Sequence, residues 1–210
     1  MFEYVFFDLD GTITEPFVGI TESVKYSLDK FGIAAENEEL KGFIGPPLKD
    51  AYMKYFDFLE KDAEKAVEYY RERYREIGIF ECELYDGIKE LLESLSKKAR
   101  LILATSKPEI FAKRILEHFG LDKYFYLIVG ASFDDSRSHK IDVLKYAIEK
   151  SGADKEKSVM IGDRVYDTES ALLCGISAIG VLYGYGNREE HEKAIYIADS
   201  VEALAAYFDV

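Results

Sequence analysis

The chain has 210 residues, 48% of them hydrophobic and 32% charged, so it is long enough to bury a substantial core. Its 40 acidic and 27 basic residues give a formal net charge of −13, which disfavours nucleic acid polymers and anionic membranes as partners. No apolar run reaches the length of a membrane span, the first residues lack the basic region of a signal peptide, and Cys82 and Cys174 stand far apart. We therefore expect a cytoplasmic protein without disulfide bonds, and its oligomeric state stays open.

Short apolar runs alternate with helical patterns along most of the chain. Runs rich in valine, isoleucine and aromatic residues predict strands at Tyr4–Phe7, Leu101–Ala104, Tyr126–Val129, Val159–Ile161 and Ala178–Val181. Amphipathic periodicity predicts helices at Asp86–Lys98, Pro108–Phe119, Ile141–Ser151 and Asp167–Cys174. Almost wholly apolar strands that alternate with helices are typical of a parallel sheet covered on both faces, so we predict an α/β, doubly wound fold.

The segment between the first two predicted strands breaks this alternation. It carries helical patterns at Ile20–Phe31, Leu48–Phe58 and Asp62–Ile77. We therefore predict two domains: an α/β core made of residues 1–15 and 82–210, and an inserted helical domain of residues 16–81. Helices that pack directly on the sheet are the alternative.

Polar residues follow several of the predicted strands. Parallel sheets bind ligands beyond the carboxyl ends of their strands, so these residues form the candidate site. The first strand is followed by Asp8 and Asp10, the second by Thr105, Ser106 and Lys107, and the fourth by Asp163 and Asp167; Lys140 stands on the loop that leads into the helix before the fourth strand.

The carboxylates of this set need a compensating cation. Asp8 and Asp10 are two residues apart, so in an extended segment their side chains point to the same side. Asp163 adds a third negative charge, which would raise the pKa values and cost stability if unpaired. A few short carboxylates suit Mg²⁺, which also supplies the positive potential needed to hold a phosphate.

A phosphate held in this way could react with the aspartates themselves. Lys140 and the hydroxyl of Thr105 can bind its remaining oxygens. One aspartate can then attack phosphorus to form an aspartyl-phosphate, while the other protonates the leaving oxygen and later takes a proton from water. The sequence thus predicts two carboxylates with separate roles.

Four motifs resemble those of the haloacid dehalogenase-like hydrolases, in the same order: DLDGT (Asp8–Thr12), LATS (Leu103–Ser106), Lys140 and GDRVYD (Gly162–Asp167). Three further stretches are similar to a bacterial branch of 5′-nucleotidases and phosphoglycolate phosphatases with a small helical cap: GFIGPPL (Gly42–Leu48), YRERY (Tyr70–Tyr74) and YGYG (Tyr183–Gly186). An aspartate at position 10 favours phosphate over halide chemistry in this family.

The resemblance implies a Rossmann-like core with an inserted helical cap and a role for each motif residue. Asp8 would be the nucleophile, and Asp10 the general acid and base. Thr105 would bind the phosphoryl group, and Lys140 would orient the nucleophile. Mg²⁺ would be held by the carboxylates of Asp8 and Asp163 and the carbonyl of Asp10, with Asp167 behind them. Candidate substrate-binding residues are Gly11, Thr105, Ser106, Lys107, Gly45 and Lys49.

The leading prediction is a Mg²⁺-dependent phosphatase for a small phosphomonoester, either a 5′-nucleotide or a phosphoglycolate-like compound. A sugar phosphomutase of the β-phosphoglucomutase type would use the same aspartyl-phosphate, and it would need cations such as Lys49 in the cap. A non-enzymatic phosphoacceptor signalling domain is the third reading, although such domains are shorter and lack a cap.

Weaker signals have simpler interpretations. Thr105 or Ser106 could cap the helix predicted from Pro108. His118, His139 and His191 lack metal-binding spacing, Asp134–Asp135 is read as a solvated loop, and YGYG is read as a loop that packs near the site.

Overall fold

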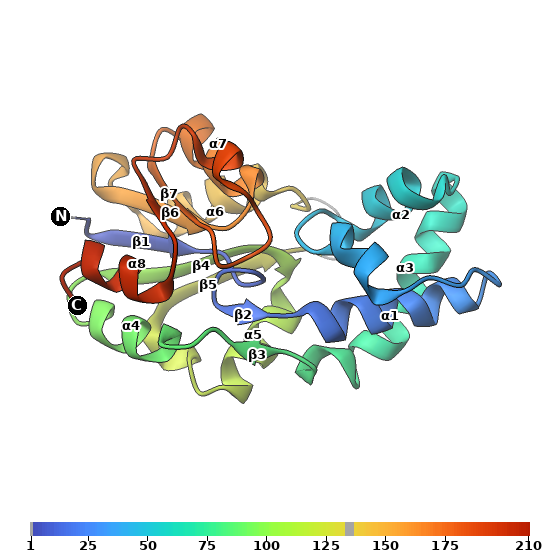
Figure 1. Cartoon of the computed structure of the whole chain (residues 1–210). Helices are drawn as coiled ribbons and strands as arrows, with labels where there is room; N and C mark the ends of the chain where they lie inside the picture. Colours follow the sequence, from blue (N-terminus) through green and yellow to red (C-terminus); the bar gives the residue numbers. More distant parts are fainter. Residues whose placement is uncertain (1, 133–136) are drawn as a thin grey trace. The chain divides into compact units, whose positions relative to one another are not determined.

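The computed structural model describes residues 2–132 and 137–210, so the pair Asp134–Asp135 lies outside the described residues. The chain divides into two compact units. One, the α/β unit, comprises Met1–Glu15 and Leu84–Val210, and the other, the helical unit, comprises Pro16–Glu83 (Figure 1).

The α/β unit is built on one six-stranded parallel sheet, which confirms the predicted fold class. Its strand order is β5-β4-β1-β6-β7-β8, and every neighbouring pair is parallel. The strands are β1 (Tyr4–Phe7), β4 (Arg100–Pro108), β5 (Phe125–Ala131), β6 (Ser158–Gly162), β7 (Ser177–Val181) and β8 (Tyr196–Ala198). Because all run the same way, their carboxyl ends share one edge of the sheet.

Helices cover both faces of this sheet. On one face, α6 (Lys140–Ser151) and α7 (Val165–Cys174) bury alternate strand residues such as Phe6, Ile102 and Met160. The other face is covered by α4 (Ile88–Leu95), α5 (Glu109–His118) and α8 (Val201–Tyr207) (Figure 1). Parallel strands are joined by right-handed crossovers. The chain builds the sheet from β1 through β4 to β5 and then continues on the other side of β1 with β6, so the helices of the two halves lie on opposite faces.

Three differences from the sequence prediction stand out. β4 continues through Thr105–Lys107 to Pro108, with an irregular register against β5 beyond Ala104. Lys140 is the first residue of α6 rather than a loop residue. β8 and α8 were not predicted, because β8 has only three residues and its pattern is too short to read.

The remaining short elements connect these layers. β2 (Thr14–Glu15) and β3 (Glu83–Leu84) form a separate two-stranded sheet where the chain leaves and re-enters the α/β unit. The α/β unit also contains the 3₁₀ helices η3 (Asp122–Tyr124), η4 (Lys155–Lys157) and η5 (Arg188–His191).

The helical unit has its own core. It consists of α1 (Phe17–Asp29), η1 (Asn37–Phe43), α2 (Leu48–Phe56), α3 (Glu60–Tyr74) and η2 (Gly78–Phe80). The buried rings of Phe43 and Tyr52 pack in it against the partly buried Phe56 and Phe58, and the hydroxyl of Tyr52 bonds to Ser27. The helices begin and end within four residues of the predicted bounds.

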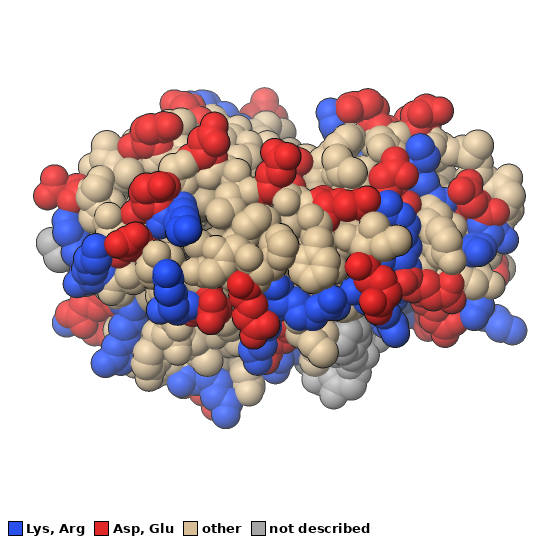
Figure 2. All heavy atoms as spheres, turned by 90° about the horizontal axis from the view of Figure 1, so that it is seen from below, with Lys and Arg blue, Asp and Glu red and all other residues tan. Residues whose placement is uncertain are grey.

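The structure also bears on membrane insertion, on the cysteines and on the surface charge. No helix in residues 2–132 and 137–210 is long and apolar enough to cross a membrane. Cys82 and Cys174 are both free thiols, as expected. Figure 2 shows acidic and basic side chains interspersed over one face of each unit.

Candidate active site

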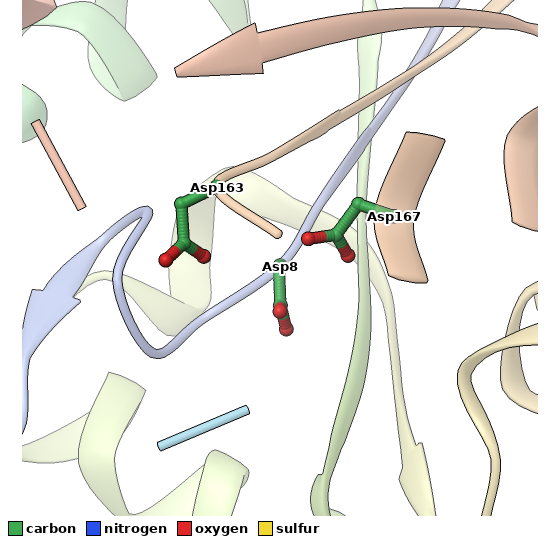
Figure 3. Close-up of side chains that lie close together, drawn as sticks. All are labelled: Asp8, Asp163 and Asp167. Atoms are coloured by element: carbon green, nitrogen blue, oxygen red, sulfur yellow. The ribbon is translucent and has the colours of Figure 1, made fainter. Parts of the chain in front are cut away.

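Three buried aspartates meet at the carboxyl edge of the sheet. Asp8 follows β1, Asp163 follows β6, and Asp167 lies in the first turn of α7. Each offers a carboxylate oxygen, and these oxygens lie within 4.8 Å of one another (Figure 3). We call these three residues the carboxylate cluster.

Lys140 lies between two members of the carboxylate cluster. Its Nζ atom is 2.7 Å from Oδ1 of Asp8 and 2.8 Å from Oδ1 of Asp167, and it donates to the carbonyl of Ala104 at 3.0 Å. Burial lowers the pKa of Lys140, but the carboxylates of Asp167 and Asp8 more than offset this effect and the pKa is raised. Lys140 therefore stays charged and fixes the direction of Asp8, whose Oδ1 also accepts from the amide of Leu9 at 2.8 Å.

Asp163 is fully buried beside the other two acids of the cluster. Burial raises its pKa well above the ordinary value, and the charges of Asp167 and Asp8 raise it further. Its Oδ2 accepts from the amide of Tyr185 at 2.8 Å, and its Oδ1 accepts from the hydroxyl of Thr12 at 3.4 Å. Gly11 permits this packing, since its φ is +80° and a Cβ atom there would lie 2.2 Å from Oδ2.

These residues fit a hard divalent cation. The donor set is all oxygen, and burial raises the pKa of Asp167 to about 6. Oδ1 of Asp167 is buried, and it shares Nζ of Lys140, 2.8 Å away, with Asp8. One lysine thus offsets three carboxylates, and a cation would supply the charge that is still missing.

Asp10 lies in a different environment from the carboxylate cluster. Its Oδ2 forms a salt bridge of 2.6 Å with Lys107, and its Oδ1 accepts from the hydroxyl of Thr14 at 3.4 Å. Burial raises the pKa of Asp10, and the charge of Lys107 offsets only part of this effect. Lys107 is itself buried, with 5% of its side chain exposed, so it is an ion-paired residue of the site rather than a solvated lysine.

Thr105 and Ser106 are placed by the end of β4. Thr105 is buried, and its hydroxyl accepts from the amide of Lys107 at 3.2 Å. Neither residue caps α5, because the N-cap position of that helix is Pro108 and no side chain bonds there. Their predicted contact with a phosphoryl group stays a prediction.

Gly45 and Lys49 belong to the helical unit. Gly45 has a φ of +106° in the turn before α2. Lys49 bonds to Glu60 at 2.7 Å and to Glu64 at 2.8 Å, and these partners raise its pKa. The predicted role of both residues in substrate binding stays a prediction.

The sequence analysis missed part of the surroundings of Asp163. The YGYG loop packs on the site as predicted. The sequence did not identify the hydroxyl of Thr12 and the amide of Tyr185 as hydrogen-bond donors to the Asp163 carboxylate. The hydroxyl of Tyr183 also donates to the carbonyl of Thr12 at 3.1 Å. The alternating glycines of the loop were the available signal, since glycine in such a position often marks a close backbone approach.

Comparisons with known proteins agree with this geometry. The chain is 42% identical to a 5′-nucleotidase of Pseudomonas aeruginosa over 93% of this chain and 90% of that protein. It is 30% identical to a phosphoglycolate phosphatase of Agrobacterium fabrum, over 97% and 91% of the two chains. It is also 39% identical to the tyrosine-protein kinase PtkA of Mycobacterium tuberculosis, over 91% of this chain and 66% of that protein.

A solved structure and a family model extend the likeness to the whole fold. The crystal structure described as a predicted phosphatase from Clostridium acetobutylicum is 47% identical, covers 99% of this chain and 98% of its own, and has a TM-score of 0.95. The model of the haloacid dehalogenase-like hydrolase family matches residues 5–181, which include all four motifs. The chain therefore belongs to the haloacid dehalogenase-like hydrolase family, which confirms the resemblance and the prediction of a hydrolytic enzyme.

Proposed function

We propose that the protein is a Mg²⁺-dependent phosphatase that hydrolyses a small phosphomonoester through an aspartyl-phosphate on Asp8. The observation that supports this proposal most strongly is that Asp8 and Asp10, two residues apart in the chain, lie in different environments. Asp8 lies in the carboxylate cluster beside Lys140, whereas Asp10 is paired with Lys107. Hydrolysis through an aspartyl-phosphate needs one carboxylate that attacks and one group that transfers a proton, and these two environments suit the two roles.

In the first step, a carboxylate oxygen of Asp8 attacks phosphorus, and the bond from phosphorus to the leaving oxygen breaks. Lys140 fixes the orientation of the Asp8 carboxylate and offsets negative charge on the phosphoryl oxygens. The raised pKa of Asp10 favours its protonated form, so its proton can pass to the leaving oxygen. The products of this step are an alcohol and the aspartyl-phosphate.

In the second step, a water molecule attacks phosphorus and the bond to Asp8 breaks. Asp10, now a carboxylate, takes a proton from that water, so free phosphate leaves and both aspartates return to their first states. Asp8, Asp163 and the carbonyl of Asp10 would hold the Mg²⁺ ion, with Asp167 behind them or joining them as a ligand. Bound there, it supplies positive charge for the phosphoryl oxygens and relieves the repulsion among the three acids.

The substrate class follows from the relatives and from the charges of the helical unit. A 5′-nucleotide or a phosphoglycolate-like compound is proposed, because relatives with these activities match along nearly all of the chain. Lys49, the cap cation that a mutase would need, is paired with Glu60 and Glu64, which favours hydrolysis over phosphoryl return. We expect the helical unit to govern substrate choice as a cap, and a cytoplasmic location stays a prediction.

Phosphate release from a panel of phosphomonoesters, with Mg²⁺ and with EDTA, tests the proposal. The panel pairs 5′-mononucleotides with phosphoglycolate and with sugar phosphates. We expect phosphate release that needs Mg²⁺, without any added bisphosphate. Activity that is unchanged in EDTA would remove the proposed metal role.

The same assay separates the alternatives. A mutase would convert a sugar monophosphate into its isomer, with a bisphosphate activator and little free phosphate. A signalling domain would hold the phosphoryl group on Asp8 for many minutes. Transfer from ATP to a tyrosine-containing peptide would instead indicate the activity named for the mycobacterial relative.

A further inference from the structure

Residues that follow β7 hold both the side chain and the main chain of Asp163. The amide of Tyr185 donates to Oδ2 at 2.8 Å, and the ring nitrogen Nε2 of His191 lies 3.0 Å from the carbonyl oxygen of Asp163. Nδ1 of the same ring lies 2.9 Å from the hydroxyl of Thr168 on α7. We call Tyr185, His191 and Thr168 the Asp163 clamp.

Glycines make this close approach possible. A Cβ atom at Gly184 would lie 2.2 Å from the carbonyl oxygen of Gly11, and one at Gly186 would lie 1.8 Å from the carbonyl oxygen of Asp163. A Cβ atom at Gly180, inside β7, would lie 2.2 Å from Cγ of His191. Glycine therefore occupies the positions in β7 and in the YGYG loop at which any other residue would displace the clamp or Asp163.

Hydrogen bonding fixes the state of the His191 ring. A carbonyl oxygen only accepts, so Nε2 must carry the hydrogen that it donates to Asp163. In the neutral ring Nδ1 then carries no hydrogen, so it accepts from the hydroxyl of Thr168. His191 is fully buried, so solvent does not compete for its hydrogen bond to Asp163.

A second contact ties the same segment to the start of α7. Oε2 of Glu190 accepts from the amide of Val165 at 2.8 Å and from Nε of Arg164 at 3.2 Å. η5 is thus bonded to residues on both sides of the turn that places Asp163 and Asp167 in the carboxylate cluster. A buried histidine needs an acceptor for its ring N–H, and here that acceptor is the carbonyl of a cluster residue.

We propose that His191, held in its Nε2–H form by Thr168, is a positioning residue that sets the place of the Asp163 carboxylate and so the cation affinity of the carboxylate cluster. The carbonyl carbon of Asp163 is two bonds from its Cβ atom, so a shift of the carbonyl moves the carboxylate. Groups that orient a metal ligand in this way contribute to affinity without touching the ion. The inference rests on the proposed cation site and adds to it a determinant outside the four family motifs.

Mn²⁺ binding to the full chain, followed by electron paramagnetic resonance of the free ion, tests the proposal without turnover. His191→Leu and Thr168→Val should weaken Mn²⁺ binding by about 10-fold to 100-fold, and Thr168→Val should be the milder change. His191→Gln can still donate from its amide to the carbonyl of Asp163, and it should retain most of the wild-type affinity. At saturating Mg²⁺, KM for the phosphomonoester should be unchanged in all three variants, because His191 and Thr168 are buried and act through Asp163.

Ser151→Ala is the matched control. Ser151 is a buried hydroxyl at the far end of α6 that bonds to the carbonyl of Ile148 at 3.1 Å. It should lower the melting temperature without changing Mn²⁺ affinity. Unchanged affinity in folded His191→Leu and Thr168→Val would overturn the proposal, and Thr168→Val alone decides if His191→Leu does not fold. Wild-type protein that binds no Mn²⁺ would instead contradict the cation site itself.

Discussion

Two lysines, one in each unit, lie between two carboxylates at nearly the same distances. Lys140 is 2.7 Å and 2.8 Å from Asp8 and Asp167, and Lys49 is 2.7 Å and 2.8 Å from Glu60 and Glu64. Their burial differs, since 4% of the Lys140 side chain is exposed against 33% of Lys49.

The difference shows that burial, rather than contact distance, determines what an ion pair does. An exposed pair is screened by water and salt and adds little stability. A buried group of charges carries a large desolvation cost, and removing one member leaves the others uncompensated. In the proposed mechanism such a group in the α/β unit holds Asp8 in place, whereas the helical unit keeps Lys49 and its glutamates at the surface.

The largest expected effect comes from removing Asp8, the proposed nucleophile. Asp8→Asn keeps the size of the side chain but is a far weaker nucleophile than a carboxylate. We expect kcat for phosphate release to fall by more than about a thousandfold, since later steps cannot proceed without the aspartyl-phosphate. Glu60→Gln, in the exposed group, is the control and should leave kcat unchanged. Substantial turnover by Asp8→Asn would contradict the assignment of Asp8.

The two lysines can be compared directly by Lys140→Met and Lys49→Met. Without its lysine, the buried group leaves Asp8 and Asp167 uncompensated, so the free energy of unfolding should fall by about 3–5 kcal/mol in EDTA. Lys49→Met should leave the denaturant midpoint nearly unchanged, because its glutamates remain hydrated. Urea titrations of both variants measure the difference. Equal destabilisation would show that burial is not the controlling variable.

Metal removal should reveal the raised pKa values of the buried acids. Asp167 has a pKa of about 6 when folded against about 3.9 when unfolded, and the pKa of Asp163 is also raised. The folded state then binds more protons than the unfolded state between about pH 4 and pH 6. Without metal, the free energy of unfolding should therefore decrease as pH rises through this window.

Mg²⁺ should reverse this loss near pH 7, by about 2.7 kcal/mol when its concentration is about a hundred times its Kd. Thermal denaturation in EDTA and in Mg²⁺, from pH 4.5 to 7.5, measures both effects. Asp163→Asn should flatten the pH dependence and reduce the stabilisation by Mg²⁺. A melting temperature at pH 7 that is the same in EDTA and in Mg²⁺ would contradict the cation site.

The sequence was sufficient for features that follow from local pattern. The apolar run Tyr4–Phe7 and the DLDGT residues after it predict both the first strand and the place of Asp8, because strand direction brings the strand ends to one edge. The pairing of Lys107 with Asp10 could not be predicted in this way, since it depends on the continuation of β4 beyond Ala104. Likewise, a single His191 carries no spacing signal, and only the fold brings it to Asp163.

The smallest expected effects compare one buried hydroxyl in each unit. Tyr52 in the helical unit bonds to Ser27, whose own hydroxyl also donates to the carbonyl of Val24 at 2.8 Å. Tyr52→Phe therefore leaves no buried donor unpaired and should lower the free energy of unfolding by about 1 kcal/mol. Its kcat and Mg²⁺ requirement should match those of the wild type.

Thr12→Val removes the hydroxyl that donates to Oδ1 of Asp163. Its stability loss should be similar to that of Tyr52→Phe, but the Mg²⁺ concentration for half-maximal activity should rise by about tenfold, because an oriented carboxylate loses one of its donors. Mg²⁺ titrations of phosphate release, beside urea titrations of the same samples, separate the two quantities. The Mg²⁺ concentration for half-maximal activity could instead rise as much in Tyr52→Phe as in Thr12→Val. Mg²⁺ affinity would then depend on overall stability rather than on contact with the carboxylate cluster, and the distinction between the two units would fail.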